Sequence, residues 1–377
     1  MRIKRWSPLA LGASAAALTV LLGGCSFDTV QSALDPQATV AREQMWLLTY
    51  TFWLSFIVVV GVGAALVYAI VRFRHKEGDD SIPPQTHGNA LLEMGLIGLA
   101  VLITIAVAIP TVRTNFRVGV RAQATEDDIV INVTGYQWWW AFDYADEGVL
   151  TANEMHVPQG SRVILNLASA DVLHSFWVPK LGGKTDLIPN QDNQLWYLID
   201  EDTPAGVYYG ECAELCLGAH AYMRMRVVVD TPEDYQAWLA SFQDIAPLEQ
   251  LSDTPTFQQV QADPLVQTGQ QLFKQKGCAA CHAIRGYAGG APDKPDLTNF
   301  GLRTSLAAGV LDNTPENLAR WLRDPQEVKP GNYMPTLWSE DDPQREEQIA
   351  ALVAYLESLG TQDAPQAQLE PGGNYGN

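Results

Sequence analysis

Cysteine is scarce in this sequence, and none is left over for structural disulfides. Only 5 of the 377 residues are cysteine. Cys25 closes a Leu-Gly-Gly-Cys run, and the others lie in two short motifs, Cys212 with Cys216 and Cys278 with Cys281. Because each thiol belongs to a recognisable motif, we expect the sulfur to bind metal, haem or lipid rather than to cross-link the fold.

Basic residues are the second shortage. The chain has 24 Lys and Arg against 43 Asp and Glu, which gives a formal net charge of −19 at pH 7. This balance argues against a nucleic-acid ligand and favours a basic protein partner that is steered by charge. A solvated acidic surface would give the same composition, so both interpretations stay open.

The N-terminus has the pattern of an export signal. Arg2, Lys4 and Arg5 precede a short apolar run that ends at a lipobox-like sequence before Cys25. We predict that residues 1–24 are a signal peptide of the lipoprotein type, that Cys25 is lipidated, and that residues 25–45 begin the mature chain. An uncleaved signal anchor with a chance cysteine is the alternative. Under either interpretation the chain is exported.

Two long apolar runs follow, at residues 46–71 and 91–112. The first has no charged residue and the second has only Glu93, near its start. Each is long enough to cross a bilayer, so residues 46–112 are predicted to form a transmembrane hairpin rather than two buried core helices. The intervening loop carries Arg72, Arg74 and Lys76, which the positive-inside rule assigns to the cytoplasm. Arg113, Arg117 and Arg121 after the second run blur this signal. The export signal and the haem-type motif near the C-terminus decide the orientation, because both ends of the chain must then face outside.

The rest of the chain changes pattern twice. Residues 113–240 contain β-branched and apolar runs bounded by Gly, Pro and Asp, which predict an all-β sandwich or barrel. Residues 241–264 are polar and contain proline, as in a linker, and residues 265–360 have helical periodicity and predict an all-α domain. Residues 361–377 are rich in Gln, Pro and Gly and are predicted to be a disordered tail.

The segment from Cys212 to Met223 combines two thiols, an imidazole and a thioether within twelve residues. These are soft or borderline ligands that suit copper. A redox disulfide between Cys212 and Cys216 is the alternative for the two thiols. Met225 is a rival to Met223, because alternate residues of a strand share one face.

A second redox motif is Cys278-Ala-Ala-Cys281-His282, which is typical of covalent haem c attachment. Its two thiols would form thioether bonds to the porphyrin, and His282 would be one axial ligand. Met334 is the only methionine of the C-terminal domain and lies in the sequence Gly-Asn-Tyr-Met-Pro, which resembles the axial-ligand loop of class I cytochromes c. His/Met ligation raises the haem potential, which suits a donor to copper.

Residues 171–179 (DVLHSFWVP), residues 181–186 (LGGKTD) and the Cys212 loop together resemble cytochrome c oxidase subunit II, from residue 46 to about 229. With the haem motif, the chain is similar to the subunit II of caa-type haem–copper oxidases. The resemblance implies a cupredoxin-like domain with a dinuclear copper centre (CuA), and a class I cytochrome c domain. The copper ligands that it implies are His174, Cys212, the carbonyl of Glu214, Cys216, His220 and Met223.

The resemblance implies three further roles. The carboxylate of Glu214 would bind a magnesium ion shared with subunit I, although such a side chain can also cap backbone amides. Trp140 would be the surface tryptophan that receives electrons, although a run of tryptophans also suits a core or a membrane interface. Glu93 would guard a proton pathway into subunit I. The residues after it, Met-Gly-Leu, differ from the usual family pattern, and an interfacial acid at a helix N-terminus is the alternative.

The expected function is that of the subunit that receives electrons in a terminal respiratory oxidase. Electrons would come from cytochrome c or a cytochrome c reductase complex, pass through haem c and copper, and reach subunit I, where oxygen is reduced to water with proton pumping. The expected partners are subunits I and III and membrane lipid, in a bacterial cytoplasmic membrane with both redox domains on the periplasmic face. The alternatives are a CuA-type nitric oxide reductase subunit and a membrane-anchored copper chaperone, which would need a thioredoxin-like βαβ fold and no haem.

Overall fold

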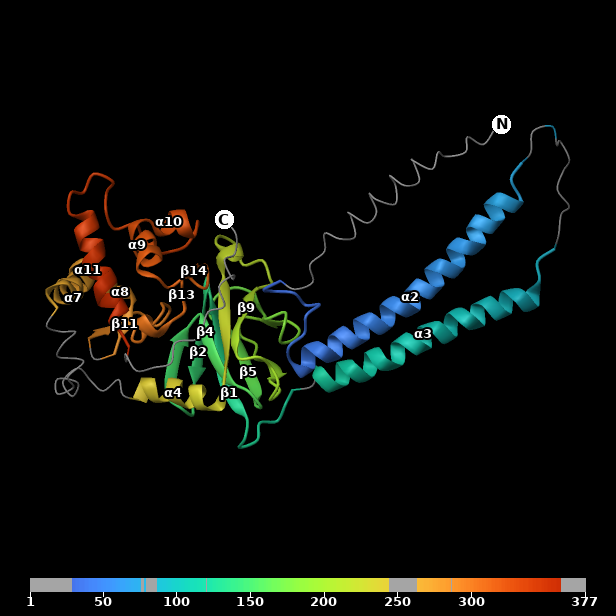
Figure 1. Cartoon of the computed structure of the whole chain (residues 1–377), viewed down its shortest axis with the longest axis horizontal. Coiled ribbons are helices and arrows are strands. Elements are labelled where there is room, and N and C mark those ends of the chain that lie inside the picture. Colours follow the sequence, from blue (N-terminus) through green and yellow to red (C-terminus); the bar gives the residue numbers. More distant parts are fainter. Residues whose placement is uncertain are drawn as a thin grey trace. The chain divides into compact units, whose positions relative to one another are not determined.

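The computed structural model describes residues 29–75, 78, 87–119, 121–243, 263–285 and 287–360 (Figure 1). The signal peptide, Cys25, Lys76, most of the linker and the C-terminal tail lie outside these residues. The chain divides into two compact units. One contains residues 43–120, and the other contains residues 30–42 together with the chain from residue 121 onward.

The first unit consists mainly of two long helices, α2 (Thr39–Arg72) and α3 (Ala90–Val118). Their mean hydropathies over the most apolar stretch are 2.6 and 2.4, so both are long and apolar enough to cross a membrane. Both helices extend beyond the apolar runs predicted from the sequence. Helix α3 begins where the side chain of Asn89 accepts hydrogen bonds from the amides of Leu91 and Leu92, which is a typical N-cap.

The second unit contains a β-sandwich of two five-stranded sheets, with strand orders β3-β2-β1-β5-β8 and β4-β10-β9-β6-β7. The first sheet contains β1 (Ile129–Tyr136), β2 (Trp139–Tyr144), β3 (Val149–Ala152), β5 (Arg162–Ser169) and β8 (Asn193–Leu198). The second contains β4 (Glu154–Pro158), β6 (His174–Trp177), β7 (Thr185–Leu187), β9 (Gly206–Cys212) and β10 (Arg224–Asp230). Strands β1 and β5 pair in parallel, as do β4 and β10, and the other pairs are antiparallel.

The sandwich core follows from alternation along the strands. In β1 the side chains of Ile131 and Val133 are buried, whereas those of Asn132 and Thr134 are only partly covered. Such a period of two turns one face of each sheet to the core and the other outward. Helix α4 (Pro232–Gln243) adds to this core and crosses the predicted domain boundary at residue 240.

The C-terminal part is mainly helical. Its helices are α7 (Pro264–Gln275), α8 (Cys278–Cys281), α9 (Pro315–Arg323), α10 (Pro325–Val328) and α11 (Arg345–Glu357). Helices α7 and α11 cross closely at Gly269, where a Cβ atom would lie 2.0 Å from the carbonyl oxygen of Ala351. The all-α expectation needs one addition, because two short ladders are present, β11 (Ala283–Ile284) with β12 (Ala288–Gly289) and β13 (Ser305–Leu306) with β14 (Leu311–Asp312).

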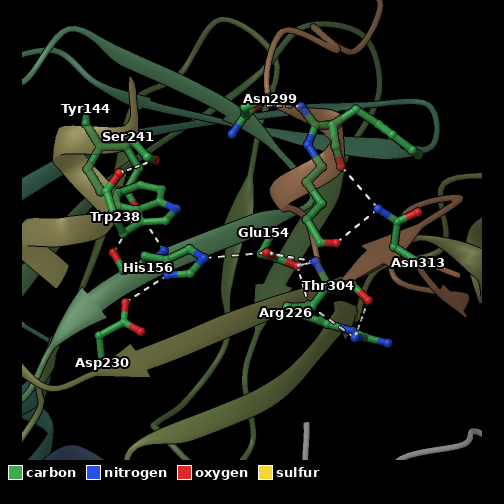
Figure 2. Close-up of polar contacts among 12 residues, drawn as sticks. Tyr144, Glu154, His156, Arg226, Asp230, Trp238, Ser241, Asn299, Thr304 and Asn313 are labelled. Carbon is green, nitrogen blue, oxygen red and sulfur yellow. Dashed lines mark hydrogen bonds and ion pairs between the residues drawn. The ribbon is translucent and has the colours of Figure 1, made fainter. Parts of the chain in front are cut away.

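A buried polar network joins the sandwich to the helical part (Figure 2). The carboxylate of Glu154 accepts hydrogen bonds from the Thr304 amide, at 3.0 and 3.1 Å, and from its hydroxyl. Arg226 donates to the Thr304 carbonyl at 2.9 Å and forms an ion pair with Asp312. Glu154 and Arg226 are almost fully buried, so these bonds compensate two charges that would otherwise be costly to bury.

His156 extends this network inside the sandwich. Its Nδ1 lies 2.8 Å from an Asp230 oxygen and its Nε2 lies 3.5 Å from a Glu154 oxygen, and its ring stacks on Trp238 with centroids 4.4 Å apart. Burial alone would lower the pKa of His156. The hydrogen bonds to Asp230 and Glu154 outweigh it and raise the pKa to about 9. His156 is therefore a charged structural residue.

Candidate metal centres

Two strand ends and one loop bring the predicted copper ligands together. His174 begins β6, Cys212 ends β9, and Met223 directly precedes β10. The amide of Cys212 donates to the carbonyl of Met223 at 2.9 Å, which closes the loop between them. His220 lies in this loop, at the start of the short 3₁₀ helix η1 (His220–Tyr222).

The sulfur and nitrogen atoms of these residues form one cluster. The separations are 3.9 Å between His174 Nδ1 and Cys212 Sγ, 3.8 Å between Cys212 Sγ and Cys216 Sγ, 3.5 Å between Cys216 Sγ and His220 Nδ1, and 3.9 Å between Cys216 Sγ and Met223 Sδ. The two thiols are free, and their separation is much longer than a disulfide bond. The donor set is soft and convergent, which fits copper.

The two thiols share their protons unequally. The hydrogen bond with Cys216 is the main reason why the pKa of Cys212 falls to about 4, and the same interaction raises the pKa of Cys216. The carbonyl of Glu214 lies 3.2 Å from Cys212 Sγ and completes the predicted ligand set. Thiolates are the metal-binding form, so metal binding here would release the remaining thiol proton.

His174 is oriented by a carboxylate. Its Nε2 lies 2.8 Å from Asp171 Oδ1, which turns Nδ1 toward the thiols. Burial lowers the pKa of His174, but its hydrogen bonds to Cys212 and Asp171 outweigh burial and raise it. A carboxylate behind a ligating histidine is a common way to fix ring orientation at metal sites.

Gln137 and Trp138 hold the copper loop from outside. The Gln137 side-chain amide and the Trp138 indole each donate to the carbonyl of Cys216 at 2.9 Å. The Trp138 ring also covers Gly218, where a Cβ atom would lie 2.2 Å from the indole. The sequence does not predict that these two residues support the copper loop. Their position directly before the tryptophan strand was the only available signal.

Trp140 lies in a different place from the one expected. Its side chain is fully buried, with its ring centroid 6.0 Å from that of His174 and 5.4 Å from that of Phe176. This burial contradicts the surface position that was expected of Trp140, on which its role as the tryptophan that receives electrons was based. The physical reason is that β2 starts at Trp139, which places Trp140 in the sandwich core. Trp138 lies in the turn beside the copper loop and is buried as well.

Three other candidates are also located. Met225 is buried on β10 against Gly210, whereas Met223 Sδ lies 3.9 Å from Cys216 Sγ, so the geometry favours Met223 as the ligand. The side chain of Glu214 is exposed, and its carbonyl faces the cluster. Glu93 lies in the first turn of α3. This position agrees both with a proton-pathway role and with the alternative of an interfacial acid at a helix N-terminus.

The haem motif lines an apolar cavity. Cys278, Cys281, His282 and Met334 all border it, and Trp138 of the sandwich does so too. His282 Nδ1 bonds to the Pro295 carbonyl at 2.9 Å, which leaves Nε2 for a metal. Burial lowers the pKa of His282, which keeps the imidazole neutral, as an iron ligand must be. The cavity and donor set fit haem c.

The loop that carries Met334 is fixed at both sides of that residue. The Met334 amide donates to the side chain of Asn332 at 2.7 Å, and its carbonyl accepts from the side chain of Gln326 at 3.0 Å. Asn332 in turn donates to the carbonyls of Pro325 and Lys329. The loop conformation is therefore set by its own side chains.

The family model for the periplasmic domain of cytochrome c oxidase subunit II matches residues 147–231, and the model for cytochrome c matches residues 266–360. Cytochrome c oxidase subunit 2 of Alkalihalophilus pseudofirmus is 37% identical over 350 residues, which cover 91% of this chain and 94% of the relative. This chain belongs to the cytochrome c oxidase subunit II family. The Bacillus sp. PS3 protein of the same name is 35% identical and covers 91% of this chain and 95% of its own length.

A further relative is quinol oxidase subunit 2 of Bacillus cereus, 32% identical over 61% of this chain and 78% of the relative. Membership of the subunit II family makes the protein part of a terminal oxidase, anchored in a membrane and bearing a periplasmic domain. The two matched domains imply copper and haem c, and the family implies association with other oxidase subunits. The two-sheet sandwich differs from the βαβ fold that a copper chaperone would need, which argues against that alternative.

Proposed function

We propose that this subunit takes electrons from a cytochrome c-type donor and passes them through haem c and a dinuclear copper centre to subunit I. There, oxygen would be reduced to water with proton pumping. The observation that carries the proposal is the position of Trp138, which borders the haem cavity and donates to the carbonyl of Cys216 in the copper loop. One side chain therefore contacts both candidate redox sites.

The ligand roles are part of the proposal. The copper ligands would be His174, Cys212, the carbonyl of Glu214, Cys216, His220 and Met223. Cys278 and Cys281 would attach the haem, with His282 and Met334 as axial ligands. The distances within the thiol and imidazole cluster and the free Nε2 of His282 support these roles. The metals supply one-electron carriers, and the protein fixes their ligands so that little has to move.

The outer surface of the copper loop is where we propose that subunit I binds. Glu214, Leu215 and Leu217 are exposed there, and two of the three are large apolar residues. Exposed leucines beside a redox centre suit a protein interface. The Glu214 carboxylate would share a magnesium ion with subunit I, because hard carboxylate oxygen suits that ion.

The membrane part completes the proposal. Helices α2 and α3 would span the cytoplasmic membrane as a hairpin beside subunits I and III, and Cys25 would add a lipid anchor. Glu93 would lie at the start of a proton pathway. The donor would be a basic cytochrome or a reductase complex, attracted by the net charge of −19.

Metal and haem analysis of the purified protein tests the cofactor set. We expect about two copper atoms and a single covalent haem per chain, from ligand sets of this kind. Cys216→Ser should lose copper and keep haem. Zinc, or a single copper atom, would overturn the dinuclear centre.

Gas consumption tests the acceptor. The purified complex with a reduced cytochrome c donor should consume oxygen, and Cys216→Ser should abolish that activity while the haem remains reducible. Rapid consumption of nitric oxide with no oxygen uptake would instead favour the nitric oxide reductase.

A further inference from the structure

The loop that carries Met334 contacts the copper side at several points. Tyr333 donates its hydroxyl to Gln137 Oε1 at 3.1 Å, and its ring centroid lies 4.8 Å from that of Trp138. Gly331 comes so close to the copper loop that a Cβ atom there would be 3.4 Å from the carbonyl carbon of Gly218. The haem-side and copper-side loops therefore meet directly.

Lys329 is the charged residue at this meeting point. Its side chain is almost fully buried, and its ammonium donates to the carbonyl of Trp138 at 2.6 Å and to that of Ala307 at 3.4 Å. Among the residues that the structure describes, these two main-chain carbonyls are its hydrogen-bond acceptors, with no carboxylate within ion-pair distance. Lys329 thus crosses from the haem domain to hold the backbone of the copper domain.

Stability alone does not explain a lysine here. Burial lowers its pKa to about 7, although the nearby Cys216 opposes this effect, so the charged form is costly. An apolar side chain of similar length would fill the space without that cost. Such a side chain, for example that of methionine, could not donate a hydrogen bond to the Trp138 carbonyl as Lys329 does. The specific contribution of Lys329 is therefore to the position of Trp138.

Trp138 is consequently fixed from three directions. Lys329 holds its carbonyl, the Cys216 carbonyl holds its indole nitrogen, and Tyr333 packs against its ring. Loss of the first contact would leave the backbone at Trp138 free to shift relative to the Met334 loop. Electron transfer across this contact depends on how closely its groups are packed, so such a shift should slow it.

We propose that Lys329 is a positioning residue for electron transfer across this contact, acting by holding Trp138 against Tyr333 and the copper loop. The inference rests on the proposed function. Lys329 of the haem domain would therefore align Trp138 of the copper domain.

A purely docking role is the competing explanation, and the network at Thr304 provides its control. Thr304 lies at the same interface but bonds Glu154 and Arg226, away from Trp138. Thr304→Val removes the hydroxyl bonds and keeps the amide bonds to Glu154. It weakens docking without touching the contacts of Trp138.

The experiment uses the intact purified oxidase with Lys329→Met, Lys329→Gln and Thr304→Val. The haem is photoreduced, and the rate at which the copper then becomes reduced is measured. Amide hydrogen exchange is measured at residues 137–139 and 329–334. We expect Lys329→Met to slow transfer at least about tenfold and to raise exchange in both segments, with haem and copper spectra and potentials unchanged. Lys329→Gln keeps a donor and should recover most of the rate, and Thr304→Val should stay within about threefold of wild type.

Three outcomes would overturn the inference. Lys329→Met could transfer at the wild-type rate, Thr304→Val could be slowed as much as Lys329→Met, or hydrogen exchange at Trp138 could be unchanged. If the wild-type haem does not reduce the copper at all, the proposed function fails first, which distinguishes the two failures. If Lys329→Met loses a cofactor, Lys329→Gln is compared with Thr304→Val instead. A Lys329→Gln variant that transfers about tenfold more slowly than Thr304→Val, with unchanged hydrogen exchange, contradicts positioning through the hydrogen bond.

Discussion

The aromatic rings of Tyr333 and Trp138 lie with their centroids 4.8 Å apart, although the two residues are almost 200 positions apart in the chain. Tyr333 precedes the candidate haem ligand Met334, and Trp138 donates a hydrogen bond to the carbonyl of Cys216. The fused haem domain is therefore joined to the copper domain at the residues that would carry electrons.

Replacing Met223 should change the copper centre, whereas replacing Met225 should not. Met223→Leu removes the thioether that lies 3.9 Å from Cys216 Sγ, so the copper EPR signal and midpoint potential should change. Met225→Leu is the matched control, because it is a volume-conserving core change that costs less than about 1.5 kcal/mol of stability. The reverse pattern in the EPR spectra would assign the ligand to Met225.

Replacing Met334 should lower the haem potential. Methionine opposite histidine stabilises the reduced iron, so Met334→Leu should shift the midpoint potential downward in a redox titration and slow transfer to copper. Met223→Leu serves as the control and should leave the haem potential unaltered. An unshifted potential in Met334→Leu would mean that another group is the second axial ligand.

Replacing Trp138 should slow electron transfer, whereas replacing Trp140 should lower the stability of the fold. Trp138→Phe loses the bond to the Cys216 carbonyl and should slow transfer from haem to copper by about tenfold or more. Trp140→Phe leaves a cavity in the sandwich core and should cost about 2 kcal/mol of stability while transfer stays near the wild-type rate. A Trp140 variant that folds normally but transfers slowly would restore the original assignment of the electron-receiving tryptophan to Trp140.

The stability of the sandwich should fall at alkaline pH. The pKa of His156 is about 9 in the folded protein against an ordinary 6.5, so the charged imidazole stabilises the fold fully below about pH 6.5. That contribution, up to about 3 kcal/mol, is lost as the pH rises through 9. Thermal unfolding of the full chain between pH 6 and 10 should show the decline, and His156→Gln should flatten it. An equal decline in the variant would assign the effect to other groups.

Much of the site could be predicted from the sequence because most of its ligands, apart from His174 and Met334, are local. The copper loop spans twelve residues and the haem motif five, so their spacing is set by the chain itself. Apolar length likewise predicted the two long helices, and strand periodicity predicted the sandwich. Local patterns of this kind need no knowledge of how distant segments meet.

The contacts between the domains could not be predicted in this way. From the sequence, Lys329 would be expected on the surface. It is buried because its side chain meets the copper domain, where it donates to the Trp138 carbonyl. The wrong expectation that Trp140 is exposed has the same origin, since exposure depends on where β2 begins and on what covers the turn before it. Glu154, Arg226 and His156 are polar residues in strands whose partners lie far away in the sequence.

The most direct test of the account is a single-turnover measurement on the intact wild-type oxidase without oxygen. The haem is photoreduced, and its absorbance and the copper EPR signal are followed together. We expect the haem to be reoxidised as the copper is reduced, electron for electron, before any electron reaches subunit I. Copper that stays oxidised beside a reduced haem, or that is reduced first while the haem is bypassed, would contradict it.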